Sequence, residues 1–175
     1  FAEDPVRILR VARFAARYMR LGFTVAEETM ALMRTMVTSG EIDALVAERV
    51  WQEIEDALSE VCPRRFFETL SECQALHRLL PELDHRATDH DSDEVPNSVP
   101  CTHALKALDK SAALSSDPRI RFAALVHELG DTDPTPLSPS TDHPPPRAGC
   151  LLQELCERLR VPKRYRQLAT MVANG

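Results

Sequence analysis

Residues 1–20 read FAEDPVRILRVARFAARYMR, and they combine a helix start with an apolar stripe and a basic stripe. Asp4 followed by Pro5 predicts the N-cap and first position of a helix, because aspartate accepts orphan amide hydrogens and proline has none to leave unpaired. At about 100° per residue, the apolar side chains fall mostly on one side of this helix. The other side carries five arginines, Arg7, Arg10, Arg13, Arg17 and Arg20. The helix is therefore expected to pack one face into a core and to present a row of guanidinium groups on the other.

A basic row of this kind is often only the solvated face of an amphipathic helix. Two features favour a binding role. All five cations are arginine, which forks onto planar acceptors, and Glu3-Asp4 lies one turn before Arg7 and Arg10. A carboxylate and a guanidinium one turn apart can read adenine and cytosine, which both present an amino donor beside a ring-nitrogen acceptor. Guanine and uracil present the reverse order, so a free or single-stranded nucleotide is a candidate ligand.

Composition favours an all-α protein. The chain has 175 residues, of which 43% are hydrophobic, and only five glycines. Its net charge of −6 is poor for a general nucleic-acid binder, so RNA would need a local basic patch, and the first helix provides one. The sequence shows no apolar run of about eighteen residues and no secretory segment, so we expect no membrane partner and a cytoplasmic location.

The cysteines are odd in number and show no Cys-x-x-Cys spacing, which predicts reduced thiols rather than a disulfide framework. The five are Cys62, Cys73, Cys101, Cys150 and Cys156.

Periodicity and helix signals predict two helical lobes, residues 1–84 and 101–175, joined by a polar linker over 85–100 that has too few apolar residues to order itself. Thr24 and Glu27 are expected to form a capping box, and Met30, Met33 and Met36 to fill the core. The predicted helices are residues 5–20, 24–37, 47–61, 63–76, 102–114, 118–129, 147–160 and 162–172.

The segment Glu3-Asp4-Pro5-Val6-Arg7-Ile8-Leu9-Arg10 resembles the Glu-Asp-x-x-Arg-x-x-Arg neck motif of the bacterial class II tRNA nucleotidyltransferases, the CCA-adding enzymes, and most closely their bifunctional type. The likeness continues through residues 48–53, which resemble the family's Glu-Arg-x-x-x-Glu motif, to residues 80–84, and weakly through residues 121–130. The resemblance implies that Asp4, Arg7 and Arg10 bind CTP or ATP and that Glu3 positions Arg7. Arg13, Arg17 and Arg20 are the residues we expect to contact RNA.

In that family the catalytic head, which holds magnesium, lies upstream of this motif, and it is absent from these residues. The resemblance therefore implies the nucleotide-selecting and tRNA-binding part of a CCA-adding enzyme. Its partners would be CTP, ATP, the tRNA 3′ end and the head domain of the same enzyme. We expect no catalytic residue in this chain, and no nucleotidyl transfer by it alone.

The second lobe resembles an HD-type phosphohydrolase domain in outline. His103 and His127-Glu128 stand where the family has its first His and its His-Asp pair, but Glu128 replaces the aspartate. His143 is the only candidate for the later loop ligand, and it is displaced. With this ligand set broken, no metal site is expected, and the lobe is predicted to be a degenerate HD-like domain. Two alternatives remain open from the sequence, a metal-dependent HD phosphohydrolase and a non-catalytic helical scaffold.

Overall fold

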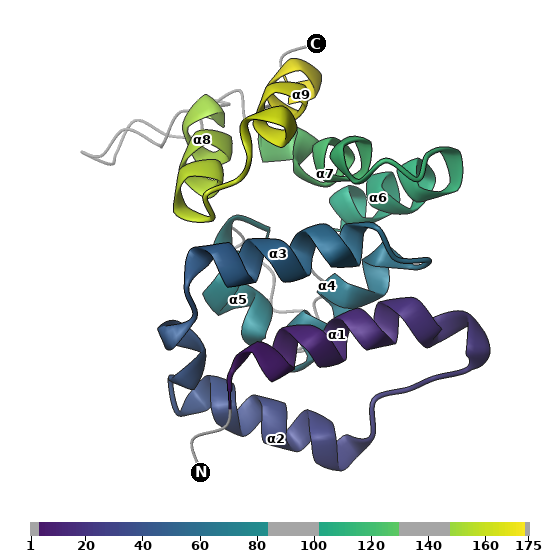
Figure 1. Ribbon diagram of the computed structural model, residues 1–175, viewed down its shortest axis with the longest axis vertical. Helices are drawn as coiled ribbons and strands as arrows, with labels where there is room; N and C mark the ends of the chain where they lie inside the picture. Colours follow the sequence, from purple (N-terminus) through teal and green to yellow (C-terminus); the bar gives the residue numbers. More distant parts are fainter. Residues whose placement is uncertain (1–3, 84–101, 130–147, 174–175) are drawn as a thin grey trace, which may run out of the picture.

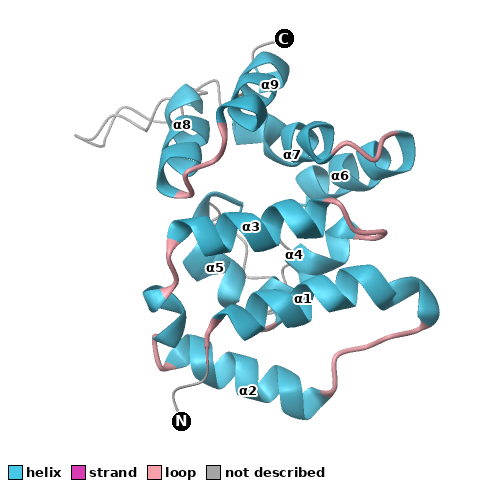
Figure 2. Ribbon diagram, viewed as in Figure 1, coloured by secondary structure: helices cyan, strands magenta, loops and turns pink. Residues whose placement is uncertain are grey.

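The computed structural model describes residues 4–83, 102–129 and 148–173, and within those ranges the chain is helical with no strand, which confirms the predicted all-α class (Figures 1 and 2). Glu3, the predicted linker 85–100 and His143 lie outside the described residues. Short 3-10 segments follow several of the helices. The α-helices are α1 Val6–Tyr18, α2 Glu27–Thr38, α3 Ala47–Leu58, α4 Pro63–Glu72, α5 Ala75–Leu79, α6 Thr102–Leu114, α7 Pro118–Val126, α8 Ala148–Arg158 and α9 Lys163–Ala173.

Helix α3 contacts helices on both sides of the predicted boundary between the lobes. In Figure 1 it runs across the middle of the molecule, with α1 and α4 below it and α7 and α9 above it. Trp51 of α3 packs edge-on against Phe122 and Tyr165, with ring centroids 5.2 and 5.0 Å away. One continuous cluster of buried residues runs from Ile8 in α1 to Ala173 in α9. The two lobes therefore pack around a common core.

The start of α2 differs from the prediction. The expected capping box of Thr24 and Glu27 does not form, because α2 begins at Glu27 itself and Ala26 before it is extended, with ψ of 145°. Val25 is partly buried against the core, which holds this segment extended and keeps Thr24 out of capping position. The methionines Met30, Met33 and Met36 are buried, as the sequence predicts.

The helix predicted over 63–76 is two helices. It ends at Glu72, and Gln74 adopts a left-handed conformation with φ of 66°. This bend turns the chain so that Leu76 and Leu79 of α5 reach the core, where both are buried. Burial of the two leucines offsets the strain of a left-handed residue that is not glycine.

Arg121 ties the two lobes together through main-chain carbonyls. Its side chain is buried, and its guanidinium donates to the carbonyl oxygens of Leu58 at 2.6 Å, Glu60 at 3.0 Å, Ala112 at 3.3 Å and Ser115 at 2.8 Å. These carbonyls lie at the carboxyl ends of α3 and α6, where helix dipoles favour a cation. Burial lowers the pKa of the guanidinium, but an arginine remains charged at neutral pH.

The described cysteines fit the predicted reduced state. Cys62, Cys73 and Cys156 are free thiols, and burial raises the pKa of Cys73 and of Cys156 to about 11, which makes both unreactive. Within the described ranges, no helix has the length and apolar character needed to span a bilayer.

Replacing Arg121 with methionine tests the connection between the lobes. Arg121→Met leaves four buried or half-buried carbonyls without their donor, and we expect it to lower the free energy of unfolding by about 3 kcal/mol. Urea denaturation followed by the fluorescence of Trp51, the chain's single tryptophan, measures this. Arg166→Met is the matched control, because Arg166 is exposed, and its unfolding midpoint should stay close to that of the parent. Equal effects of the two variants would contradict a role for Arg121 in joining the lobes.

Candidate nucleotide-binding site

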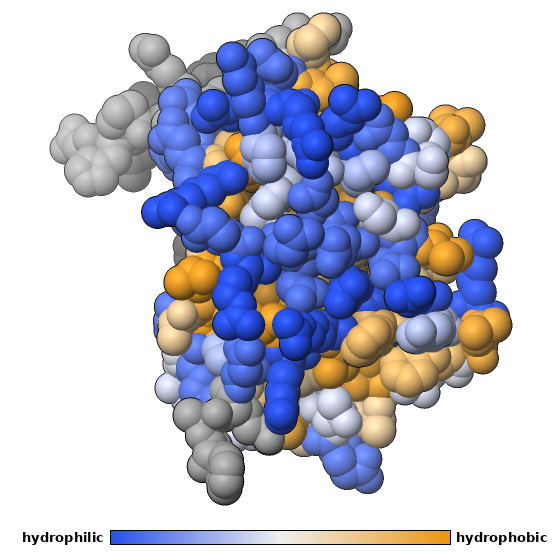
Figure 3. Space-filling view, in the orientation of Figure 1, coloured by the Kyte–Doolittle hydropathy of each residue, from blue (hydrophilic) through white to orange (hydrophobic). Residues whose placement is uncertain are grey.

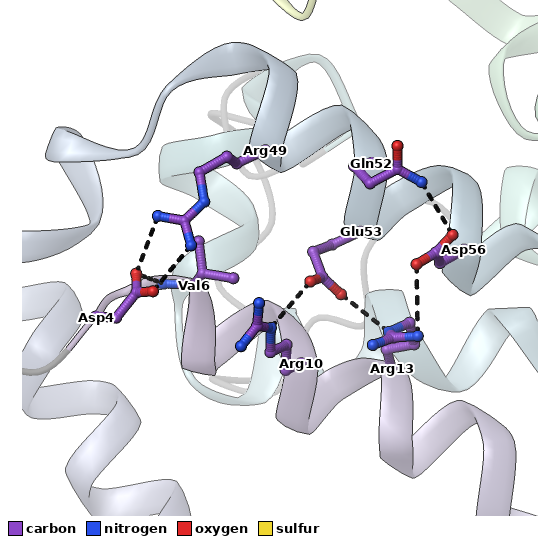
Figure 4. Close-up of polar contacts among 8 residues, drawn as sticks. All are labelled: Asp4, Val6, Arg10, Arg13, Arg49, Gln52, Glu53 and Asp56. Carbon is purple, nitrogen blue, oxygen red and sulfur yellow. Dashed lines mark hydrogen bonds and ion pairs between the residues drawn. The ribbon is translucent and has the colours of Figure 1, made fainter.

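Asp4 is fixed at the start of α1 by two donors. Its carboxylate accepts a hydrogen bond from the amide of Val6 at 3.2 Å and a two-point contact from Arg49 of α3, the shorter bond being 2.9 Å (Figure 4). The Val6 hydrogen bond, followed by Arg49, holds the pKa of Asp4 below its usual value. The charged form is therefore favoured, and its stabilising contacts are complete above about pH 4 and are lost as the pH falls through the lowered pKa.

The Asp4 contact corrects one detail of the predicted cap. The helix begins at Val6 rather than at Pro5, and the aspartate side chain bonds the amide two residues on, although the residue directly before the helix makes no side-chain cap. Asp4 therefore satisfies one orphan amide of α1 as predicted, while its second oxygen is held by a residue from another helix.

Glu53 joins α1 to α3 beside this carboxylate. It is buried, with 7% of its surface exposed, and lies between two arginines of α1. Arg10 Nε donates to Glu53 Oε1 at 3.2 Å, and Arg13 Nε lies 2.9 Å from Oε2 as an ion pair (Figure 4). Arg13 also lies 3.5 Å from Asp56, one turn further along α3. A buried carboxylate is stable only when paired, so this contact fixes how α1 lies on α3.

The structure places the three described residues of the predicted nucleotide site, Asp4, Arg7 and Arg10, at the amino-terminal part of α1. Asp4 and Arg7 are exposed, and Arg10 is half exposed with its terminal nitrogens pointing away from Glu53, on the side of Asp4 (Figure 4). Arg10 is also near enough to contribute to the lowered pKa of Asp4. A carboxylate acceptor and guanidinium donors are thus presented to solvent within two helical turns.

The three predicted RNA contacts divide into two kinds. Arg13 is mostly covered and is engaged by Glu53 and Asp56. Arg17 and Arg20, at the carboxyl end of the helix, are exposed, and in the part of the chain that the structure describes neither pairs with a carboxylate. Arg17 instead lies over the ring of Tyr18, 5.6 Å from its centroid.

Three arginines of residues 158–164 form ion pairs with residues of the first lobe. Arg158 forms a two-point ion pair with Glu82, and Arg164 lies 2.8 Å from Glu55. Arg160, held in a left-handed conformation, pairs with Glu48. These pairs join α8 and α9 to the first lobe, and they leave fewer guanidinium groups for a phosphate backbone.

The HD-like positions do not form a ligand cluster in the described ranges. His103 Nδ1 lies 3.2 Å from Glu128 Oε1, and His127 Nδ1 lies 2.8 Å from the carbonyl oxygen of Ala124. No three His, Cys, Asp or Glu side chains of residues 4–83, 103–129 and 151–173 lie together as metal ligands would.

The sequence predicts Asp4, Arg7 and Arg10 as nucleotide-binding residues, and the structure adds the contacts that hold Asp4 and Arg10. The contact between Asp4 and Arg49 joins positions 45 apart in the chain, and that between Arg10 and Glu53 joins positions 43 apart. The likeness of residues 48–53 to a second neck motif was the only signal that this part of α3 supports the site.

Removing the charge of Glu53 tests how α1 is held. Glu53→Gln leaves Arg10 and Arg13 without their shared carboxylate, and we expect the free energy of unfolding to fall by about 2–3 kcal/mol. Asp56→Asn is the control, because Asp56 is partly exposed and should change the stability by about 0.5 kcal/mol or less. Urea titrations of both variants measure the difference. A Glu53→Gln protein as stable as the parent would show that the ion pairs do not hold the helix.

Comparison with known proteins bears on both lobes. A family model described as "Probable RNA and SrmB-binding site of polymerase A" matches residues 22–86. The chain is 53% identical over 175 residues to the multifunctional CCA protein of Thioalkalivibrio sulfidiphilus, covering 99% of this chain and 43% of that protein. It is 51% identical to those of Teredinibacter turnerae and Cupriavidus necator, covering 98% and 99% of this chain and 42% of each relative.

The chain therefore spans less than half the length of these curated relatives. No solved structure matches it. The sequence matches nevertheless confirm the predicted resemblance to the CCA-adding enzymes: over nearly its whole length, this chain is similar to the multifunctional CCA proteins, and its first lobe matches a probable RNA-binding region.

Proposed function

We propose that this chain is the nucleotide-selecting and tRNA-binding part of a CCA-adding tRNA nucleotidyltransferase, an enzyme that adds cytidine and adenosine to tRNA 3′ ends from CTP and ATP. The observation that carries the proposal is the Asp4 carboxylate, held by Val6 and Arg49 one turn before Arg7 and two turns before Arg10. The similarity to multifunctional CCA proteins supports it.

Asp4 serves as the acceptor for the base. A carboxylate offers about four lone-pair sites, and the Val6 amide and Arg49 leave capacity for one more donor on a side chain that is 42% exposed. Because its pKa is lowered, this group is ionised at neutral pH. It accepts the amino hydrogen of cytosine or adenine, and it repels the carbonyl oxygen that guanine or uracil would place there.

The arginines supply the complementary donors. Arg7, exposed and one turn from Asp4, donates to the ring nitrogen beside the amino group. Arg10 is anchored through Nε, so its terminal nitrogens are held in place and lose little conformational freedom when they contact the nucleotide. The site is thus preorganised by α3. Because cytosine and adenine share the same donor–acceptor edge, one set of groups reads both CTP and ATP.

Transfer RNA binding depends on local charge, because the whole chain is acidic with a net charge of −6. Arg17 and Arg20 carry this role best, since Arg13 is engaged by two carboxylates. Contacts of this kind bind phosphates and position the RNA without reading its sequence.

Nucleotidyl transfer itself is assigned to the head domain of the same enzyme, acting in the cytoplasm with magnesium. The described residues of this chain do not fit a magnesium site, because they bring no three carboxylate or imidazole side chains together, and no step proposed here depends on the metal. The chain supplies base selection and RNA positioning.

Calorimetric titration of the chain with each of the four nucleoside triphosphates, with magnesium present, tests base selection. We expect binding of CTP and ATP and much weaker binding of GTP and UTP, because Asp4 accepts from an amino group and repels a carbonyl oxygen. Equal affinity for all four, or no binding to any, would contradict selection by this chain.

Arg7→Ala identifies the donor in the same titration. The substitution should weaken the binding free energies of CTP and of ATP by about 1–3 kcal/mol each, the value of a lost bidentate contact. Arg20→Ala is the matched control, since Arg20 lies at the far end of the same helical segment and should leave nucleotide affinity unchanged. Unchanged affinity in Arg7→Ala would remove Arg7 from the base-reading pair.

A further inference from the structure

Three aromatic rings form an exposed row at the carboxyl end of α1. Phe14, Tyr18 and Phe23 are 42%, 38% and 46% exposed, although aromatic side chains are usually well covered. The ring centroids of Phe14 and Tyr18 are 6.2 Å apart, as are those of Tyr18 and Phe23. In Figure 3 apolar surface gathers at the lower right, where Figure 1 places this end of α1 and the segment that leads to α2.

The row is built by a turn at Gly22. Gly22 has φ of +79°, a conformation that glycine adopts without strain, and the amide of Phe23 donates back to the carbonyl oxygen of Tyr18 at 3.3 Å. The turn returns Phe23 onto Tyr18, so the ring is held against the helix end rather than left on a free segment.

The segment that bears the row carries only positive charge. No Asp or Glu occurs between Asp4 and Glu27 in the sequence, while Arg17 and Arg20 lie between Phe14 and Phe23 in the chain. Arg13 lies 5.6 Å from the centroid of the Phe14 ring, as Arg17 does from that of Tyr18. Exposed rings beside arginines are complementary to the bases and phosphates of a single-stranded nucleic acid.

Two rings of the row, Phe14 and Tyr18, lie on the same face of α1 as Arg7. At about 100° per residue, Phe14 and Tyr18 project within about 20° of the direction of Arg7. At 1.5 Å per residue they lie about 10 and 16 Å further along α1. An RNA strand stacked on these rings would therefore run along the helix toward the proposed base-reading pair.

We propose that Phe14, Tyr18 and Phe23 form a stacking platform for unpaired nucleotides at the 3′ end of the RNA, with Arg17 and Arg20 neutralising the adjoining phosphates. The inference rests on the proposed function, which supplies RNA as the ligand and its 3′ end as the part that must reach the nucleotide. The probable RNA-binding region begins at Gly22, inside this surface, which favours RNA over a protein partner as its occupant.

Fluorescence anisotropy with two labelled RNAs tests the platform, a blunt-ended hairpin and the same hairpin with a single-stranded 3′ extension. The parent chain should bind the extended hairpin more tightly. Tyr18→Ala and Phe14→Ala should each weaken that binding by about 5- to 100-fold, and change binding of the blunt hairpin by about twofold at most. Replacing both Arg17 and Arg20 with glutamine should weaken binding of both RNAs. The slope of log K against log salt concentration should become less steep by about 1.4 to 2.

Two controls separate stacking from folding. Tyr18→Phe keeps the ring and should bind like the parent chain, while Leu32→Ala removes an exposed apolar side chain from α2 and should change neither affinity. Because both mutated rings are exposed, the urea midpoints of the alanine variants should match the parent midpoint.

The outcomes distinguish this inference from the proposed function. If the arginine substitutions weaken binding of both RNAs but the alanine substitutions do not, the platform is overturned and the proposed RNA binding stands. If the rings instead bind a protein partner, the alanine variants would bind both RNAs with the affinity of the parent chain, which also overturns the platform. If the parent chain binds neither RNA, both the platform and the proposed tRNA binding are overturned.

Discussion

The arrangement of the first lobe depends on Glu53, a carboxylate buried between Arg10 and Arg13. Removing such a group from water costs several kcal/mol unless cations meet it, so α1 can lie on α3 only in an orientation that places both arginines there. The same orientation brings Asp4 to Arg49, one turn earlier on α3. A contact that first serves packing thus also sets the position of the proposed base acceptor.

The carboxylates of helix α3 decide which arginines are paired within the protein. Glu53 and Asp56 take arginines of α1, while Glu48 and Glu55 take Arg160 and Arg164 of the second lobe. The guanidinium groups left without a carboxylate in the described ranges include Arg17, which lies over the exposed ring of Tyr18, and Arg20 near the end of the same helical segment. Pairing of other arginines within the protein allows an acidic chain to keep a short basic segment for the proposed RNA contact.

Apolar periodicity and the prolines at the starts of α4 and α7 were enough to predict most helices to within a few residues. The bend at Gln74 could not be predicted, because a left-handed residue other than glycine leaves no pattern and forms only when the leucines after it find the core. In the proposed site, spacing and the resemblance to the neck motif predict Asp4, Arg7 and Arg10. Their partners Arg49 and Glu53 are more than forty positions away, and only packing brings them together.

The most direct measurement is a crystal structure of the chain with CTP bound. The account predicts that the amino group of cytosine donates to Asp4 and that Arg7 donates to the ring nitrogen beside it, while Arg49 and Val6 keep their bonds to the carboxylate. A cytosine base bound elsewhere, or one that reaches this end of α1 without contacting Asp4, would contradict the central claim that this carboxylate reads the base.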